Sequence, residues 1–324
     1  DLPGAAVPWP ATPLNLVLLT VACLVVVLVL PWLLPRRGWS LAVAALGALV
    51  VLQPAGAIGW PPPGWVMVAC DVGQGDALVL NAGGGAAMVV DTGPDPTAID
   101  GCLDRLEVDV VPLVLLTHLH ADHAAGLAGV GEGRPVAELE VGPLDSPPDQ
   151  FRDALRWAGR WRVPVRRAVY GERRRLGQLS WRVVGPVDGS ATALAVDGTE
   201  GSESGAENNA SLVLAVRTRG ARLLLTGDVE PEGQQALLGA HPNLRADVLK
   251  VPHHGSRYQD EEFLTSVGAD VAIVSVGADN DYGHPATEVL RLLELVGTDA
   301  YRTDLSGDVA VVVDHSSLSV ETQD

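Results

Sequence analysis

The stretch LLTHLHADHAAGL, residues 115–127, places three of the chain's eight histidines and an aspartate within six positions. The apolar run VVPLVLL before it, residues 110–116, is typical of a buried strand, and AAGLAGV after it predicts the start of a helix. The polar side chains therefore lie where a strand ends. Ligands two positions apart cannot share one face of an α-helix, but they can converge from a loop.

These side chains have the chemistry of metal ligands. Imidazoles and a carboxylate in one loop suit zinc, manganese or iron. Four candidates, His118, His120, Asp122 and His123, exceed what one catalytic metal usually takes from protein, so we expect two metal ions. Further ligands should then follow other strands, and polar groups do so at Asp228, His253, His254 and His284. Singly these are equally consistent with turn or cap residues, but together they favour a site at the strand ends.

Two uncharged runs, residues 14–34 and 39–60, come near the start of the chain. At 1.5 Å per residue each helix would reach about 30 Å, the thickness of a bilayer core. The alternatives are a signal peptide, which has a shorter apolar stretch and a cleavage site, and a buried helical hairpin. We predict a transmembrane hairpin with Arg36 and Arg37 in the cytoplasm and everything after residue 60 on the outer face.

Composition limits the partners of the chain. A net charge of -18 disfavours general binding to nucleic acid. However, ten of the 22 basic residues lie between Arg152 and Arg182, where they form either a phosphate-binding patch or a solvated surface. The three cysteines, Cys23, Cys70 and Cys102, are scattered and odd in number, so we predict buried thiols and no disulfide framework.

The Pro/Gly-rich segment 54–65 predicts a boundary between domains 1–64 and 65–324. Beyond it, apolar runs predict strands that alternate with helices, a pattern typical of two sheets packed face to face with helices outside. Residues 188–208, rich in Gly, Ser and acids, are predicted to be a mobile loop. The predicted strands cover 66–72, 76–82, 87–93, 110–116, 136–141, 178–186, 211–218, 221–228, 247–251, 270–276, 308–314 and 318–322, and the helices 97–107, 123 onward, 149–160, 231–239, 260–266 and 286–296.

The motif HxHxDH, followed by an aspartate that closes a strand and by later histidines, resembles the metallo-β-lactamase superfamily. A longer series of motifs over residues 65–322 resembles the C-terminal domain of the ComEC family of competence DNA-uptake channels. This resemblance implies an α+β four-layer αββα sandwich after the last transmembrane helices of a channel. The motifs are DVGQGDALVL (71–80), VVDTG (89–93), ENNASLVL (207–214), LLTGDVE (224–230), LKVPHHGS (249–256) and YGHP (282–285).

The resemblance also implies roles for these residues. His118 and His120 would hold the first metal, Asp122, His123 and His284 the second, and Asp228 would bridge both. Asp91 would orient the metal loop from behind. Asp122, His253 and His254 would be catalytic, each of the two histidines being a further ligand or a proton donor, and Arg257 would contact substrate phosphate.

The chain departs from the superfamily pattern at residues 207–209, Glu-Asn-Asn, where many members have a third histidine for the first metal. If an oxygen of this stretch, with Asn208 beside the site, replaces that histidine, the preference shifts from zinc toward a harder ion such as manganese. The alternative is weak or absent binding at the first site.

The resemblance implies a metal-dependent nuclease in the cell membrane, with its C-terminal domain outside, that degrades the non-transported DNA strand during natural transformation. Its partners would be DNA, the membrane, the remaining channel and other competence proteins. The alternatives are a metal-stabilised gate or DNA guide without catalysis, and a hydrolase of small esters or thioesters. Fold alone does not decide among them.

Overall fold

The computed structural model describes residues 59–187, 203–315 and 317–323. Contacts divide the chain into two units, Asp1–Trp60 and Pro61–Asp324, and almost all described residues belong to the second. The predicted transmembrane hairpin, apart from its last two residues, lies outside the described residues. Among the helices that are described, none has the length and apolar character needed to cross a membrane.

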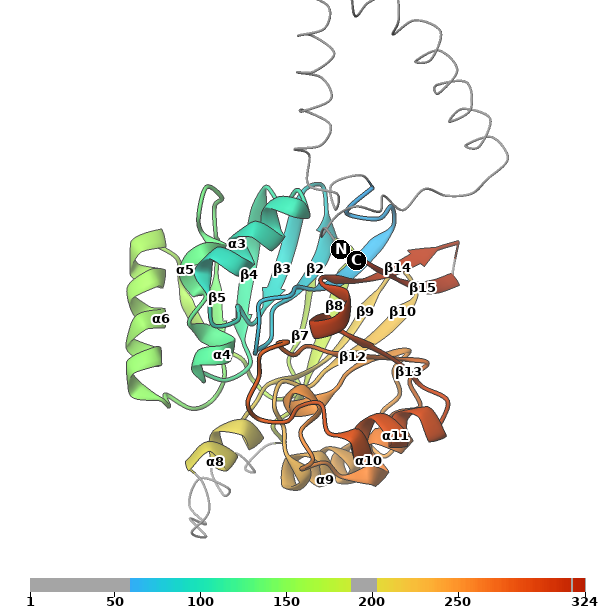
Figure 1. Cartoon of the computed structure of the whole chain (residues 1–324). Helices are drawn as coiled ribbons and strands as arrows, with labels where there is room; N and C mark the ends of the chain where they lie inside the picture. The colour runs from blue at the N-terminus through green and yellow to red at the C-terminus, as the bar shows by residue number, and fades with distance from the viewer. Residues whose placement is uncertain (1–58, 188–202, 316, 324) are drawn as a thin grey trace, which may run out of the picture. The chain divides into compact units, whose positions relative to one another are not determined.

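The second unit contains two sheets (Figure 1). The first sheet has eight strands, in the order β15 (Ser317–Thr322), β14 (Val309–Asp314), β1 (Trp65–Ala69), β2 (Leu78–Gly83), β3 (Ala86–Val90), β4 (Val110–Leu116), β5 (Leu139–Val141) and β6 (Val165–Arg167). The second has seven, in the order β13 (Asp299–Arg302), β12 (Val271–Val274), β11 (Val248–Lys250), β10 (Ala221–Leu225), β9 (Val213–Thr218), β8 (Leu179–Gly185) and β7 (Arg173–Leu176).

Helices lie on the outer side of each sheet (Figure 1). Those beside the first sheet are α3 (Pro96–Arg105), α4 (Ala121–Ala124), α5 (Leu127–Val130) and α6 (Pro148–Trp161). Those beside the second are α9 (Pro231–Ala240), α10 (Glu261–Val267) and α11 (Thr287–Leu295). Shorter helices are α8 (Glu203–Asn209), η2 (Pro252–Gly255) and α12 (Thr303–Ser306). The expected sandwich of two sheets between helices is confirmed.

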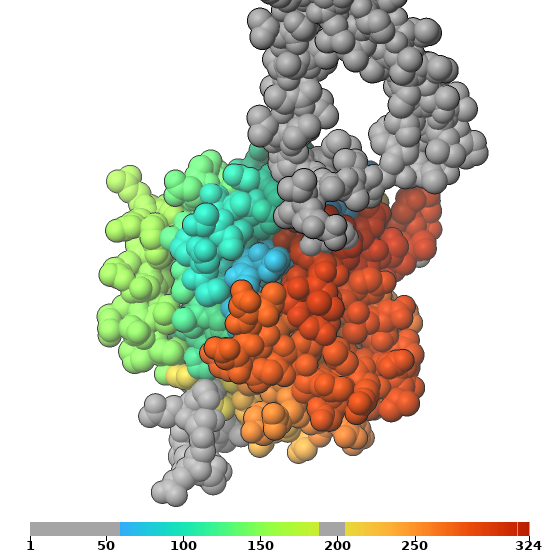
Figure 2. Space-filling view, in the orientation of Figure 1, coloured from blue at the N-terminus to red at the C-terminus, as the bar shows by residue number. Residues whose placement is uncertain are grey.

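Alternation along the strands places the core between the sheets, because successive side chains of a strand point to opposite faces. One buried cluster joins Met67 and Leu115 of the first sheet to Trp181 and Leu223 of the second. The opposite face of the second sheet packs against its helices, where Phe263 is fully buried. In the space-filling view, residues 59–187 and residues 203–323 lie directly against each other (Figure 2).

Parallel pairing positions the functional loops. Strands β3 to β6 are parallel, as are β10 to β13, so within each group the carboxyl ends lie along one edge. Hydrogen bonds join the loops that follow β4, β10 and β11 at this edge. Leu212, just before β9, donates to the carbonyl of Thr117, just after β4, and His253, after β11, donates to the carbonyl of Gly227, after β10. Polar residues at the ends of strands far apart in sequence thereby become neighbours.

The structure corrects three predictions of secondary structure. The helix expected from residue 123 is interrupted between α4 and α5 at Gly126, whose NH donates to the Gly93 carbonyl and where a Cβ atom would lie 2.0 Å from the Thr92 oxygen. The last part of the predicted loop 188–208 is helix α8. Strands β6, β7 and β13 were not expected, because they are short and rich in charged or polar residues rather than alternating apolar ones.

The prediction of buried thiols is wrong for two cysteines. Cys70, directly after β1, and Cys102 in α3 form a disulfide with a Cα–Cα distance of 6.0 Å. They are 32 residues apart in sequence, and the packing of α3 on the first sheet brings them together. Their scattered spacing gave no sign of this contact. Cys23 lies outside the described residues.

Reduction of this disulfide should destabilise the second unit. Opening a loop of this length removes a constraint on the unfolded chain worth about 3–4 kcal/mol. We expect urea unfolding to show a free energy of unfolding lower by about that amount in Cys70→Ala/Cys102→Ala, while Cys23→Ala leaves it unchanged. Equal stability of the double variant and the parent would contradict the disulfide.

Candidate metal centre

Loops at the carboxyl ends of four strands bring most of the predicted site residues to one edge. Asp91 follows β3, residues 118–123 follow β4, Asp228 follows β10, and His253 and His254 lie in η2 directly after β11. Both histidines of η2 have left-handed backbone, with φ of 49° and 53°, which is costly for residues other than glycine. Backbone and side-chain hydrogen bonds hold this conformation, since His253 NH donates to Gly227 O and His254 Nδ1 lies 2.9 Å from Ser275 O.

Four of these side chains converge on one point. Asp122, His123, Asp228 and His254 each offer a ligand atom, and these atoms lie within 4.8 Å of one another. Nε2 of His123 and Nε2 of His254 each lie 3.2 Å from Oδ2 of Asp228, and His254 Nε2 lies 3.4 Å from Oδ2 of Asp122. Two atoms bound to one ion at about 2.1 Å in tetrahedral geometry are separated by a similar distance, about 3.4 Å.

Unsatisfied polar atoms indicate that a cation belongs there. Nε2 of His123, Nε2 of His254 and Oδ1 of Asp228 are buried without a hydrogen-bond partner. Buried polar atoms in native proteins are nearly always satisfied, so unpaired ones that converge require a ligand. A divalent cation satisfies imidazole nitrogens and carboxylate oxygens together, and the residues present therefore fit a metal ion.

His118 and His120 form the neighbouring part of the site. Nε2 of His118 lies 3.0 Å from Nδ1 of His120, and the His118 and His123 rings are 4.1 Å apart between centroids. Glu207 of α8 reaches His120, with 2.6 Å between Oε2 and Nε2. A carboxylate oxygen thus stands in the stretch where the superfamily pattern has a third histidine, and it contacts the nitrogen of His120 opposite the one that faces His118. Burial, and next the charge of His123, lower the pKa of His118 well below its usual value, which leaves it neutral.

Asp91 lies behind the metal residues, as expected of an orienting residue. Its carboxylate accepts hydrogen bonds from the Thr117 backbone NH and hydroxyl, both at 2.7 Å. Its Oδ2 also lies 2.9 Å from Nδ1 of His123. This contact places the Nδ1 proton toward Asp91 and turns Nε2 toward Asp228, which fixes the tautomer that binds a metal.

Sequence reasoning missed Lys250 and Asp76. Lys250 is the only lysine of the chain and is completely buried. Its Nζ forms an ion pair with Asp76, lies 3.5 Å from Oδ1 of Asp228 and donates to the Gly227 carbonyl at 3.0 Å. Asp76 also contacts His254, at 3.3 Å from Nδ1. The signal was a lone cation inside the apolar run DVLKV, because a buried charge requires a buried partner.

His253 stands beside the four converging residues. Its Nε2 lies 4.0 Å from Oδ2 of Asp228, and its Nδ1 lies 3.5 Å from Oε1 of Glu230. Asn208, expected beside the first site, instead donates to that same oxygen of Glu230 at 2.9 Å. Burial is the main cause that lowers the pKa of His253. Asn208 therefore holds Glu230 beside His253, whose Nδ1 has no hydrogen-bond partner.

His284 is not among the four converging residues, although it lies close to them. Its ring centroid is 5.4 Å from that of His253 and 6.4 Å from that of His254. Burial, followed by the charges of His253 and His254, lowers the pKa of His284 to about 4. Arg257 is exposed nearby, and its charge acts on His284 in the same direction.

The electrostatics of the centre show how it is balanced without an ion. Burial opposes the charge on Asp228, but His123, His254 and Lys250 outweigh it and lower the pKa of this carboxyl well below its usual range. Burial likewise opposes protonation of His123 and His254, yet Asp228 and the other aspartates raise the pKa of both well above the usual value. In the metal-free chain, protons therefore occupy the positions that a cation would take.

Comparison with known proteins identifies the class. A family model described as the metallo-beta-lactamase superfamily matches residues 70–277. The chain belongs to this superfamily, whose fold binds divalent metals, and the converging acid and histidine residues are its candidate metal centre. Among solved structures, a mutant of the CmlA beta-hydroxylase is similar with a TM-score of 0.51 and 12% identity, covering 78% of this chain and 55% of that one, which shows the fold alone.

Competence proteins are among the relatives of the chain. The chain is 33% identical over 199 residues to ComE operon protein 3 of Bacillus subtilis (strain 168), covering 60% of this chain and 24% of that protein. It is 28% identical over 307 residues to Competence protein ComA of Neisseria gonorrhoeae, covering 92% of this chain and 38% of that protein. The predicted resemblance to the ComEC family is confirmed. The chain spans less than two fifths of the length of these two relatives.

Metal binding should release protons and strengthen as pH rises. Since His123 and His254 have raised pKa values in the metal-free chain, they carry protons at neutral pH that an ion must displace. We expect on the order of two protons released per ion at pH 7, measured by titration calorimetry in buffers of different ionisation enthalpy. Affinity that is independent of pH, with no proton release, would show that these histidines are not ligands.

Removal of the buried lysine should destabilise the chain far more than removal of an exposed cation. Lys250→Met leaves Asp76 and Asp228 buried without their cation, which costs about 3–5 kcal/mol. The matched control is Arg222→Met on neighbouring β10, which breaks a partly exposed ion pair with Asp247 worth about 1 kcal/mol or less. Urea unfolding of both variants in EDTA measures the difference, and similar losses would disprove the buried pair.

Proposed function

We propose that the chain is a metal-dependent phosphodiesterase that cleaves DNA in competence, with the centre around Asp228 as its active site. The observation that carries this proposal is the convergence of Asp122, His123, Asp228 and His254. Among the four, only Asp122 is partly exposed, so the centre opens to solvent on its side. The competence proteins among its relatives support DNA as the substrate.

A divalent cation held by these residues would act as a Lewis acid on a phosphoryl oxygen and lower the pKa of an attacking water toward neutrality. Nε2 of His118 and Nδ1 of His120 would hold a second ion, and Glu207, which contacts the opposite nitrogen of His120, would orient that ring. The exposed Arg257 would orient the substrate phosphate.

The geometry supports different roles for His253 and His254, which the sequence left open. His254 is buried and has both ring nitrogens directed at buried partners, so we assign it to the metal. His253 is the more exposed of the two, with Nδ1 on the side of Glu230 and Nε2 4.0 Å from Oδ2 of Asp228. We assign His253 to moving a proton at Nε2 during cleavage.

The disulfide supports an extracytoplasmic position for the second unit, because disulfides persist mainly in oxidising compartments. Arg36 and Arg37 between the two apolar runs support the same orientation. We therefore propose a multi-pass protein of the cell membrane whose metal centre meets incoming DNA outside. There it degrades one strand while the remaining channel, with other competence proteins, takes up the other.

The test is cleavage of single- and double-stranded DNA by the purified chain with manganese, zinc or magnesium. Asp228→Asn should abolish cleavage and reduce bound metal. His253→Gln should lower kcat by about 10²–10⁴-fold with metal content unchanged, whereas His254→Gln should lose metal. The matched controls are Asp314→Asn and His315→Gln, in an exposed turn far from the centre in sequence.

Full cleavage by Asp228→Asn would disprove the assigned active site. Hydrolysis of a small ester or thioester without any cleavage of DNA would replace the proposal with a small-molecule hydrolase. A metal-loaded chain that hydrolyses neither substrate would indicate a gate or DNA guide.

A further inference from the structure

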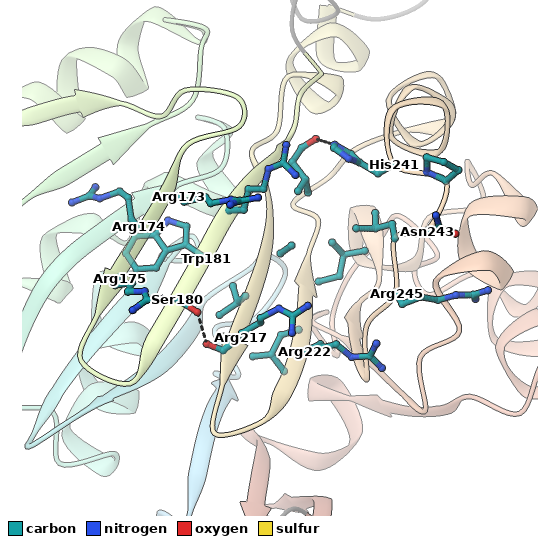
Figure 3. Close-up of a pocket in the computed structure, with 18 residues that line it drawn as sticks. Arg173, Arg174, Arg175, Ser180, Trp181, Arg217, Arg222, His241, Asn243 and Arg245 are labelled. Atoms are coloured by element: carbon teal, nitrogen blue, oxygen red, sulfur yellow. Dashed lines mark hydrogen bonds between the residues drawn. The ribbon is translucent and has the colours of Figure 1, made fainter.

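A groove rich in arginine lies on the helix side of the second sheet, away from the metal centre. It has a volume of about 710 Å³ and is bounded by strands β7 to β10 on one side and by residues 241–245 on the other (Figure 3). None of the predicted metal ligands lines it. Six arginines face it from these elements, namely Arg173, Arg175, Arg182, Arg217, Arg222 and Arg245.

Strand register places these arginines in two rows. One row crosses four strands through directly paired residues, from Arg175 on β7 through Ser180 and Arg217 to Arg222 on β10. In the next row Arg173 of β7 is paired with Arg182 of β8. With strands about 4.8 Å apart, the first row spans about 14 Å. The cations therefore form a ribbon across the sheet.

Fold stability does not explain this arrangement. Like charges directly opposite each other on adjacent strands are destabilising, and Arg173 faces Arg182 while Arg217 faces Arg222. Arg222 is paired with Asp247, and Arg174, which also borders the groove, turns to Glu138 and Glu140. Within the described part of the chain, none of the other arginines that face the groove has an ion pair, and no carboxylate lines it.

The groove fits an extended polyanion. Arginine binds phosphate oxygens through two parallel hydrogen bonds, and a row of arginines, most of them without an ion pair, matches a row of phosphates. The row is concave and lies between a sheet and a loop, so a chain of phosphates can enter it whereas a flat lipid surface cannot. The protein as a whole has a net charge of -18, so the arginines make the groove a local positive region that attracts the phosphate backbone.

The groove and the metal centre are joined by continuous elements. Strand β10 runs from Arg222 in the groove to Leu225, about 10 Å at the rise of a strand, and Asp228 follows three residues later. Helix α9 begins at Pro231, three residues after Asp228, and ends at Ala240, directly before the groove loop. A strand of nucleic acid held in the groove would therefore extend toward the centre alongside α9.

We propose that this groove binds the sugar-phosphate backbone of DNA and holds the strand while another part of it lies at the metal centre. The inference rests on the proposed function only for the identity of the polyanion. The contacts are to phosphates, so binding is independent of base sequence and falls steeply with salt.

The test is the affinity of the purified chain for a single-stranded oligonucleotide and a duplex in EDTA, which separates binding from cleavage. The groove variant is Arg173→Gln/Arg175→Gln/Arg217→Gln, three exposed side chains. We expect its affinity to fall at least about ten-fold, and the slope of log affinity against log salt to decrease by about 2 for the single strand. Its hydrolysis of bis(p-nitrophenyl) phosphate, which is too small to span both sites, should match that of the parent.

The matched control is Arg152→Gln/Arg156→Gln/Arg160→Gln on α6, which removes the same charge from exposed positions beside the first sheet. Equal losses in both variants, or no loss in either, would overturn the groove as the binding site. Binding of phosphatidylglycerol vesicles but not DNA through the groove arginines would also overturn it. Absence of hydrolysis by the parent would count against the proposed function, while the binding result in EDTA would still decide the groove.

Discussion

The buried carboxylate of Asp228 is the constraint on which this edge of the molecule depends. A carboxylate removed from water is strongly unfavourable unless cations or donors surround it. His123, His254 and Lys250 supply that environment, and they come from the loop after β4, the turn after β11 and β11 itself. Since these segments belong to both sheets, the charge cluster is complete only when the sheets pack together. The same contact thus links folding to the formation of the site.

Charge balance explains why this edge holds a metal. Asp76, Asp122 and Asp228 all have lowered pKa values and are therefore charged, and Lys250 compensates one of the three. Because Asp91 adds a further buried carboxylate beside His123, negative charge exceeds the single positive charge of Lys250 when the histidines are neutral, and a divalent cation offsets this excess. Without the cation, two imidazolium groups take its place. The lysine and Asp76 do not contact substrate in this account; they set the charge that the centre presents to an ion.

The sequence predicted the sandwich because its strands are apolar runs of regular length, and it predicted most of the site because metal-binding residues cluster after such runs. It did not separate His254 from His284, since both follow a strand and only packing shows that His254 reaches Asp228. It missed the Cys70–Cys102 disulfide for a related reason, because helix packing and not spacing creates that contact. The sequence shows Lys250 as a lone cation in an apolar strand, but only the fold shows that Asp76 is its partner.

In this account the metal centre at the strand ends cleaves the phosphodiester, and the arginine groove on the sheet face binds the DNA backbone. The central claim is that one cation lies among Asp122, His123, Asp228 and His254. The most direct test is a crystal of the chain grown with manganese and measured for anomalous scattering at the manganese edge. We predict a peak within coordination distance of all four side chains. The absence of a peak among these four side chains, with Lys250 and the two histidines unchanged around Asp228, would contradict the account.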